Sequence, residues 1–164
     1  LADGDEHEYN KSHRDKKHFK HEDERELSLV ENPTYAENCG ACHYAYQPGL
    51  LPSNSWEKIL DNLGNHFGEI VDIAPPVTLE ISEFLKANGA NQSHAELSRK
   101  IMKSLGAQTP LRISKIPYIH KKHDDIPRST FSRKSIRSLS NCSACHTNAE
   151  KGIYDDDNVT IPRQ

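Results

Sequence analysis

The sequence has little apolar material and no long hydrophobic run. Only 34% of its 164 residues are hydrophobic, and no stretch of about 18 apolar residues is present to span a bilayer, which argues against a membrane-spanning protein. An excess of positive charge is also missing. The 21 Lys and Arg residues face 24 Asp and Glu residues, a net charge of -3, which disfavours a general nucleic-acid binder. Because the apolar content is low for a globular chain of this length, we expect something other than side chains to help fill the core.

Methionine and cysteine are scarce, with one Met and four Cys, whereas there are 10 His. The cysteines form two Cys-x-x-Cys pairs, each followed at once by a histidine: Cys39-Gly40-Ala41-Cys42-His43 and Cys142-Ser143-Ala144-Cys145-His146. This pattern is the attachment signature of c-type haem. Two thiols three residues apart lie on one side of a helical turn, where each can add to one haem vinyl group, and the next histidine supplies the proximal iron ligand. The pattern predicts two covalently bound haem c groups, held by Cys39, Cys42, Cys142 and Cys145, with His43 and His146 on the irons.

Three other uses of cysteine pairs compete with haem attachment. A four-cysteine zinc site uses similar pairs but does not require a histidine after each one. A thioredoxin-like redox motif needs a βαβ unit around it, which the sequence does not show. A disulfide framework would rarely place each cysteine three residues from its only partner. Two complete motifs that use every cysteine favour haem.

Two haems would also supply the missing core. Each macrocycle is a large apolar disc around which small helices can pack. We therefore predict that the protein without haem is largely unfolded, since the polypeptide alone buries too little surface.

The composition divides the chain into three parts. Residues 1–27 form a charged arm with His7, His13, His18 and His21, a composition typical of a solvated segment or of metal binding. Residues 28–106 are predicted to form a small helical domain with the first haem, and residues 107–164 a C-terminal lobe with the second. The predicted fold class is mainly α, with a cytochrome c-like domain, an irregular haem lobe and few or no strands.

Three helices are expected in the middle of the chain. The first begins near Asn54, with a capping-box pattern, and continues along an apolar stripe to Phe67 before Gly68. The second follows Pro75 and Pro76, is capped by Thr78 and ends at Asn88-Gly89. The third begins at Ser93, with Glu96 completing a capping box, and ends at Gly106.

The distal iron ligands are expected to be histidines. Met102, the only methionine, adjoins apolar Ile101 on a predicted helix and is expected to pack in the core. His66 is predicted to serve the first haem. His123 is preferred to His120 for the second, because Asp124 and Asp125 follow it and a carboxylate can orient an imidazole ring. His94 is given no haem role. The pattern leaves open which distal histidine serves which iron.

Beyond the motifs, the sequence resembles the small dihaem cytochrome c family (DHC). The resemblance covers roughly residues 30–164 and is carried by residues 35–43, 46–52, 55–56, 66–69, 110–114, 117–118, 123, 141–146, 149–150 and 161–163. It implies a helical cytochrome c domain followed by an irregular haem lobe, and low-spin haems with two histidines on each iron. His66 and His123 match the family's distal ligand positions. The resemblance also implies periplasmic electron transfer, often with a membrane cytochrome b or an oxygen-binding haem protein as partner.

The favoured function is electron transfer without catalysis, since two six-coordinate irons leave no open site for substrate. Both haems are expected to have low potential, because methionine ligation is absent. One alternative is a subunit of an extracellular haem filament that assembles through residues 1–27. Another is a dihaem peroxidase, which would need an open iron position and acid-base groups beside it.

Covalent haem attachment predicts a location outside the cytoplasm, either the periplasm or the cell exterior. The chain starts at Leu1 without a signal peptide, as expected if one has been removed. The expected partners are redox proteins, with no nucleic acid and no transmembrane segment.

Overall fold

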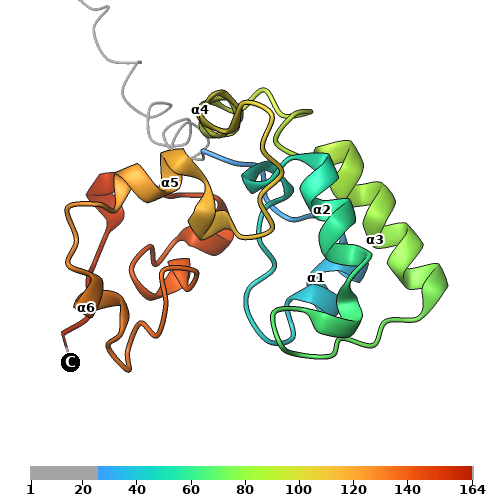
Figure 1. Ribbon diagram of the computed structural model, residues 1–164, viewed down its shortest axis with the longest axis horizontal. Coiled ribbons are helices and arrows are strands. Elements are labelled where there is room, and N and C mark those ends of the chain that lie inside the picture. Colours follow the sequence, from blue (N-terminus) through green and yellow to red (C-terminus); the bar gives the residue numbers. More distant parts are fainter. Residues whose placement is uncertain (1–25, 164) are drawn as a thin grey trace, which may run out of the picture.

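The computed structural model describes residues 26–163, and its elements are short helices (Figure 1). Within these residues no strand forms, and two isolated β-bridges join His66 to Glu69 and His146 to Val159. The predicted mainly α fold class is therefore confirmed. None of the helices between residues 26 and 163 has the length and apolar content needed to cross a membrane.

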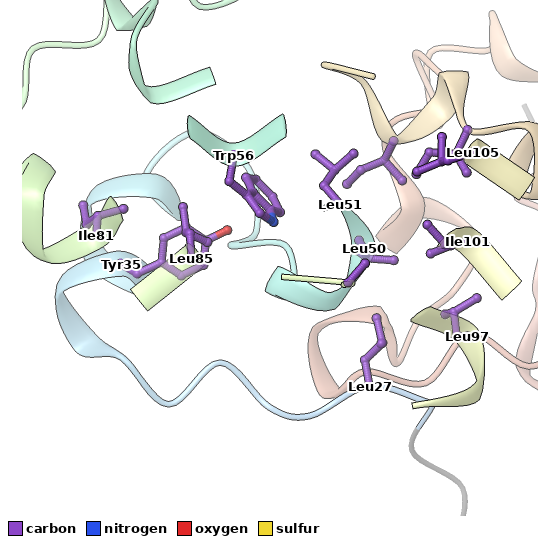
Figure 2. Close-up of a cluster of buried hydrophobic side chains, with 13 residues drawn as sticks. Leu27, Tyr35, Leu50, Leu51, Trp56, Ile81, Leu85, Leu97, Ile101 and Leu105 are labelled. Atoms are coloured by element: carbon purple, nitrogen blue, oxygen red, sulfur yellow. The ribbon is translucent and has the colours of Figure 1, made fainter. Parts of the chain in front are cut away.

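The N-terminal lobe, residues 33–105, holds the longer helices. It comprises α1 (Pro33–Cys39), the 3-10 turn η1 (Pro48–Leu50), α2 (Ser53–Leu60), the 3-10 turn η2 (Leu63–Asn65), α3 (Pro75–Asn88) and α4 (Glu96–Leu105). Helices α1, α2 and α3 lie together on one side of the molecule (Figure 1). Their facing side chains form one part of the buried core, with Tyr35, Trp56, Ile81 and Leu85 (Figure 2).

The core continues from these helices to α4. Leu50 and Leu51 lie between the two groups and meet the apolar face of α4, which carries Leu97, Ile101 and Leu105 (Figure 2). Trp56 and Ser98 satisfy their buried polar groups with backbone carbonyls, as burial favours, whereas the buried Ser55 hydroxyl on α2 has no partner. The indole N–H of Trp56 donates to the carbonyl of Pro48 at 2.8 Å, and the Ser98 hydroxyl donates to that of Gly49 at 2.9 Å.

The C-terminal lobe, residues 107–163, has shorter elements and much less of a core. It comprises η3 (Ile113–Lys115), α5 (Pro117–Lys122), α6 (Arg128–Phe131), η4 (Cys142–Ala144), η5 (Ala149–Lys151) and η6 (Asp156–Asn158). Ile113 and Ile116 join the core of the N-terminal lobe, which leaves Ile136 and Ala149 as the other buried apolar residues of this part of the described chain.

The two lobes meet at a seam formed by residues 26–27, 47 and 149–154. The backbone N–H groups of Glu26 and Leu27 donate to the carbonyl of Gly152 at 2.9 and 3.1 Å, and Leu27 is buried in the core. Gly152 has a φ of +76°, and a Cβ there would lie 2.2 Å from the Leu27 carbonyl oxygen, so the seam needs glycine. The buried Gln47 side chain crosses the seam and donates to the carbonyl of Ala149 at 2.7 Å.

The three predicted helices exist, but the prediction of the first one's end was wrong. Helix α2 stops at Leu60, and the chain then turns through η2. Asn62, Gly64 and Asn65 have low helix propensity, which outweighs the apolar stripe that favoured a helix to Phe67. The predicted ends at Gly89 and Gly106 are confirmed, and Gly106 has a φ of +56°.

The predicted N-terminal caps were also wrong. Asn54 lies inside α2, which begins at Ser53. Helix α3 follows Ala74 with proline at its first positions, and α4 follows Ala95; neither Ala74 nor Ala95 caps its helix with a side chain. The hydroxyl of Ser93 accepts a hydrogen bond from the Ala95 N–H before α4 begins.

Candidate haem sites

The first Cys-x-x-Cys-His motif begins at the end of α1. Asn32 caps this helix by accepting a hydrogen bond from the Tyr35 N–H at 2.7 Å, and Cys39 is its last residue. Cys42 and His43 follow in an exposed turn. All four cysteines of the chain are free thiols, available for thioether bonds.

The rings of His43 and His66 face one another. Their centroids are 6.4 Å apart, and the ring planes differ by 20°. An imidazole binds a metal ion through one nitrogen at about 2 Å, so two rings on opposite sides of one ion have centroids about 6 Å apart. His43 Nδ1 hydrogen-bonds the Tyr44 carbonyl at 2.8 Å, which leaves Nε2 available. This pair fits the two axial positions of one haem iron.

A tight turn, and not the predicted helix, presents His66. His66 and Glu69 exchange backbone hydrogen bonds of 2.7 and 3.1 Å, and Phe67 between them has a φ of +56°, unusual for a bulky residue. The Phe67 ring packs on His66, with 4.8 Å between centroids. The guanidinium of Arg112, from the C-terminal lobe, lies 4.1 Å above the Phe67 ring. This cation–π contact supports the turn from the other lobe.

The first site also favours neutral side chains. Burial lowers the pKa of His66, and the nearby His43 and Arg112 lower it further. The neutral imidazole, which is the metal-binding form, is therefore favoured. Burial raises the pKa of the Cys39 thiol to about 11, so a thiolate is disfavoured there.

The second motif forms a single turn in the C-terminal lobe. Cys142 begins η4, and its carbonyl accepts from the N–H groups of Cys145 and His146 at 3.1 and 2.8 Å. The end of the chain supports this turn, because the N–H of Thr160 donates to the Cys145 carbonyl at 2.9 Å. Both cysteines and the histidine thus come together within one turn, as the motif predicts.

The rings of His123 and His146 are also close together, in an edge arrangement with 6.0 Å between centroids and 72° between planes. His123 follows the last residue of α5, and its Nδ1 lies 2.7 Å from the Ile119 carbonyl. The expectation that Asp124 or Asp125 orients this ring was therefore wrong. The last carbonyls of a helix have no partner within the helix, so they are available to a ring four residues later.

These two rings open onto an apolar cavity of about 280 Å³. Cys142 and Cys145 line it together with apolar side chains that include Ile119, Ile126, Phe131, Ile136, Leu139 and Ile161. Nδ1 of His146 is buried and has no hydrogen-bond partner, an orphaned polar atom of a kind that is uncommon in folded proteins. Two thiols, two neighbouring imidazoles and apolar walls fit a haem.

The zinc alternative does not fit this arrangement. Within residues 26–163, no three His, Cys, Asp or Glu side chains are grouped so that they could hold a metal ion. Burial also raises the pKa of the Cys142 and Cys145 thiols. Burial lowers the pKa of His146, and His123 lowers it further, while Asp156 and Asp155 oppose the shift.

The other candidates lie away from the two sites. His94 and His120 are exposed, and Met102 packs against the core as expected. The arm histidines His7, His13, His18 and His21 lie outside the described residues.

The tyrosines around the two sites were not predicted from the sequence. Tyr46 packs on His43 with 4.9 Å between centroids, and Tyr154 lies 5.7 Å from His146. Tyr44 adjoins His43 in the chain. Tyr46 lies in a stretch quoted for the family resemblance, which was the one available signal for its importance.

Comparisons with known proteins match most of this chain. The family model "Dihaem cytochrome c" matches residues 35–154. A solved structure of the dihaem cytochrome c from Rhodobacter sphaeroides is 38% identical, with a TM-score of 0.69, and the match covers 77% of this chain and 99% of that one. The dihaem cytochrome of Shewanella baltica OS155 is 36% identical, with a TM-score of 0.66 and coverages of 82% and 95%. No curated protein matches.

The length of these matches matters as much as their identity. They extend far beyond the two attachment motifs, and nearly the whole length of each solved relative is covered. The family model extends from within α1 through α6 to beyond the second motif. With both halves of the fold and both attachment motifs shared, this chain belongs to the dihaem cytochrome c family and carries two haems of the c type.

Proposed function

We propose that this dihaem cytochrome transfers electrons with each iron held between two histidines. His43 and His66 would serve the haem of the N-terminal lobe, and His146 and His123 that of the C-terminal lobe. The observation that carries the proposal is the separation of the two rings in each pair, with centroids 6.4 and 6.0 Å apart. The cysteines of each motif would form the thioethers.

When bound, haem c supplies one-electron redox chemistry. His43, His66, His123 and His146 would hold the two irons, which would leave no position on either metal for a substrate. The hydrogen bonds from Nδ1 of His43 and His123 to backbone carbonyls hold the rings with Nε2 free. This arrangement suits an electron carrier better than an enzyme. Because Met102 packs in the core, methionine does not raise either potential, and both are low.

The ligand assignment is tested with single variants of the haem-loaded protein. His66→Ala and His123→Ala should each convert one haem from low-spin to high-spin, as read from the absorption spectrum, and admit carbon monoxide. His94→Ala is the matched control and should change neither haem, since its ring is exposed. If His120→Ala opens a haem and His123→Ala does not, the assignment at the second site is wrong.

The alternatives make different predictions for the unaltered protein. Its intact mass should exceed the polypeptide mass by two haems after denaturation. A high-spin signal in the oxidised protein would indicate an open axial position and favour the peroxidase alternative.

The location and partners follow from the same chemistry. Covalent haem attachment takes place outside the cytoplasm, so the protein would act in the periplasm or at the cell exterior. Its partners would be redox proteins, for which the family resemblance suggests a membrane cytochrome b or another haem protein.

The filament alternative stays a prediction. It rests on residues 1–27, of which residues 1–25 lie outside the described residues. A deletion that tests it should end at residue 25, because Leu27 belongs to the core. The filament is supported if the deletion turns an assembled protein into a monomer by light scattering, and is contradicted if the full chain is already monomeric.

A further inference from the structure

Two tyrosines connect the haem sites across the seam. Tyr44 directly follows His43, and its hydroxyl oxygen lies 3.0 Å from that of Tyr154. The ring of Tyr154 lies against the ring of His146, with 5.7 Å between centroids. The contact therefore joins Tyr44, next to His43 in the chain, to Tyr154, whose ring packs on His146.

The hydrogen bonds along this connection have a defined direction. Gln47 donates through Nε2 to the carbonyls of Ala149 and Glu150, at 2.7 and 3.2 Å, so its Oε1 is the acceptor for the Tyr154 hydroxyl. A phenol has a single proton to donate. Since Tyr154 donates to Gln47, Tyr44 must donate to the oxygen of Tyr154. Such a chain of aligned bonds strengthens its members.

A second contact parallels the first. The Tyr46 ring packs on His43 with 4.9 Å between centroids and 36° between planes. Its hydroxyl donates to the carbonyl of Ser140, two residues before Cys142, at 2.6 Å. Tyr46, three residues after the first motif, therefore contacts the backbone just before the second.

The polar character of the connection sets it apart from ordinary packing. Gln47 is 1% exposed, and Tyr44 and Tyr154 are half-buried. Burying such groups is unfavourable unless every donor has a partner, and a fully paired network is satisfied in one geometry only. Apolar side chains could have joined the lobes but would tolerate sliding between them.

We propose that Tyr44, Tyr154 and Gln47 are positioning residues that hold the two haem sites in one fixed relation and thereby set the rate of electron exchange between them. The proposal rests on the proposed function. One electron leaves the reduced site and one electron enters the oxidised site. The tyrosines remain phenols throughout and are neither oxidised nor reduced.

The test uses the haem-loaded protein with Tyr44→Phe, Tyr154→Phe and both together. Phenylalanine keeps each ring and removes only the hydroxyl. Tyr44→Phe is the milder change, because Tyr154 can still donate to Gln47. Tyr35→Phe is the matched control: its buried hydroxyl donates to the Tyr46 carbonyl, within the N-terminal lobe.

The measurement is the electron exchange rate between the two haems in half-reduced protein, from exchange spectroscopy of the haem methyl signals by NMR. We expect exchange in the double variant to be several-fold slower than in Tyr35→Phe, with both haems still low-spin. Equal rates in the double variant and the control would overturn the proposal. Loss of a low-spin signal in Tyr44→Phe would also overturn it, since the hydroxyl would then act within one site.

The proposed function is checked separately, on the unaltered protein. If its haems are not low-spin before any substitution, the histidine assignment fails, whatever the tyrosine variants do.

Discussion

At the scale of single residues, Glu26 places a partly buried carboxylate at the seam, where its charge affects the stability of the protein. Its carboxylate accepts a hydrogen bond from the Tyr154 N–H at 2.7 Å. Burial raises the pKa of Glu26; the Tyr154 N–H opposes this shift, and Asp155 adds to it. Because the folded state holds the proton more tightly than the unfolded state, this group reduces stability as the pH rises through its pKa.

Glu26→Gln should therefore stabilise the protein at pH 7. The amide oxygen can still accept from the Tyr154 N–H, while the partly buried charge is removed. The gain in melting temperature over the unaltered protein should disappear near about pH 4, where the glutamate is largely protonated. Thermal unfolding of the haem-loaded protein at both pH values measures this, with the exposed Glu31→Gln as control. A gain of equal size at both pH values would show that charge is not the cause.

The residues of the two haem attachment motifs could be predicted from the sequence, because their spacing along the chain identifies them. The two attachment motifs are local, so the turn that gathers Cys142, Cys145 and His146 follows from them. Tyr44 and Tyr154 could not be predicted in the same way. They are far apart in the chain, and their hydrogen bond exists only because the two lobes meet.

At the scale of elements, the start of α3 lacks a side-chain cap. Ala74 precedes the helix with a φ of −57° and a ψ of 140°, an extended geometry compatible with a cap. Serine is strongly preferred over alanine at such a position, because its oxygen accepts a hydrogen bond from the first turn. Because Pro75 and Pro76 lack an N–H, the first such donor is Val77, whose N–H already donates to the Ala74 carbonyl at 2.9 Å and would be shared with the serine oxygen.

Ala74→Ser should stabilise the protein by about 0.5 to 1 kcal/mol. Thr78, which the sequence favoured as the cap, has the opposite role, since its hydroxyl donates back to the carbonyls of Ile73 and Ala74 at 3.3 Å. Thr78→Ala should therefore change stability by less than about 0.5 kcal/mol. Chemical denaturation of both variants tests this, and a larger loss in Thr78→Ala would restore the cap assignment.

The elements were easier to predict at their ends than at their starts. Asn88-Gly89 and Gly106 stop α3 and α4 where the sequence indicates, because glycine takes backbone conformations that end a helix. The start of α3 was misplaced because proline at the first helical position is itself a start signal, and it competed with the polar Thr78.

At the scale of the molecule, the two lobes differ in how much of their own core they contain. Most of the buried apolar residues belong to the N-terminal lobe, whereas the C-terminal lobe surrounds an apolar cavity. The low apolar content of the sequence suggested that haem fills the core. The composition could not show that the C-terminal lobe depends on haem for its core more than the N-terminal lobe does, because burial depends on how the helices pack.

Loss of the second haem should therefore unfold the C-terminal lobe selectively. In Cys142→Ala/Cys145→Ala, we expect hydrogen exchange to lose protection over residues 107–163, while α2 and α3 stay protected by their own core. Cys39→Ala/Cys42→Ala is the matched variant and should leave the C-terminal lobe protected. Loss of hydrogen-exchange protection in both lobes of both variants would mean that the lobes unfold as one unit.

The hydrogen bonds from Glu26 and Leu27 to Gly152 bear on the order in which the protein folds. Contacts between residues distant in sequence form slowly, because a long loop must close first. The helices of the N-terminal lobe contact near neighbours in the chain and can assemble before that closure. We therefore expect the seam between the lobes to form last and the second cysteine pair to stay open to haem attachment until the final stage of folding.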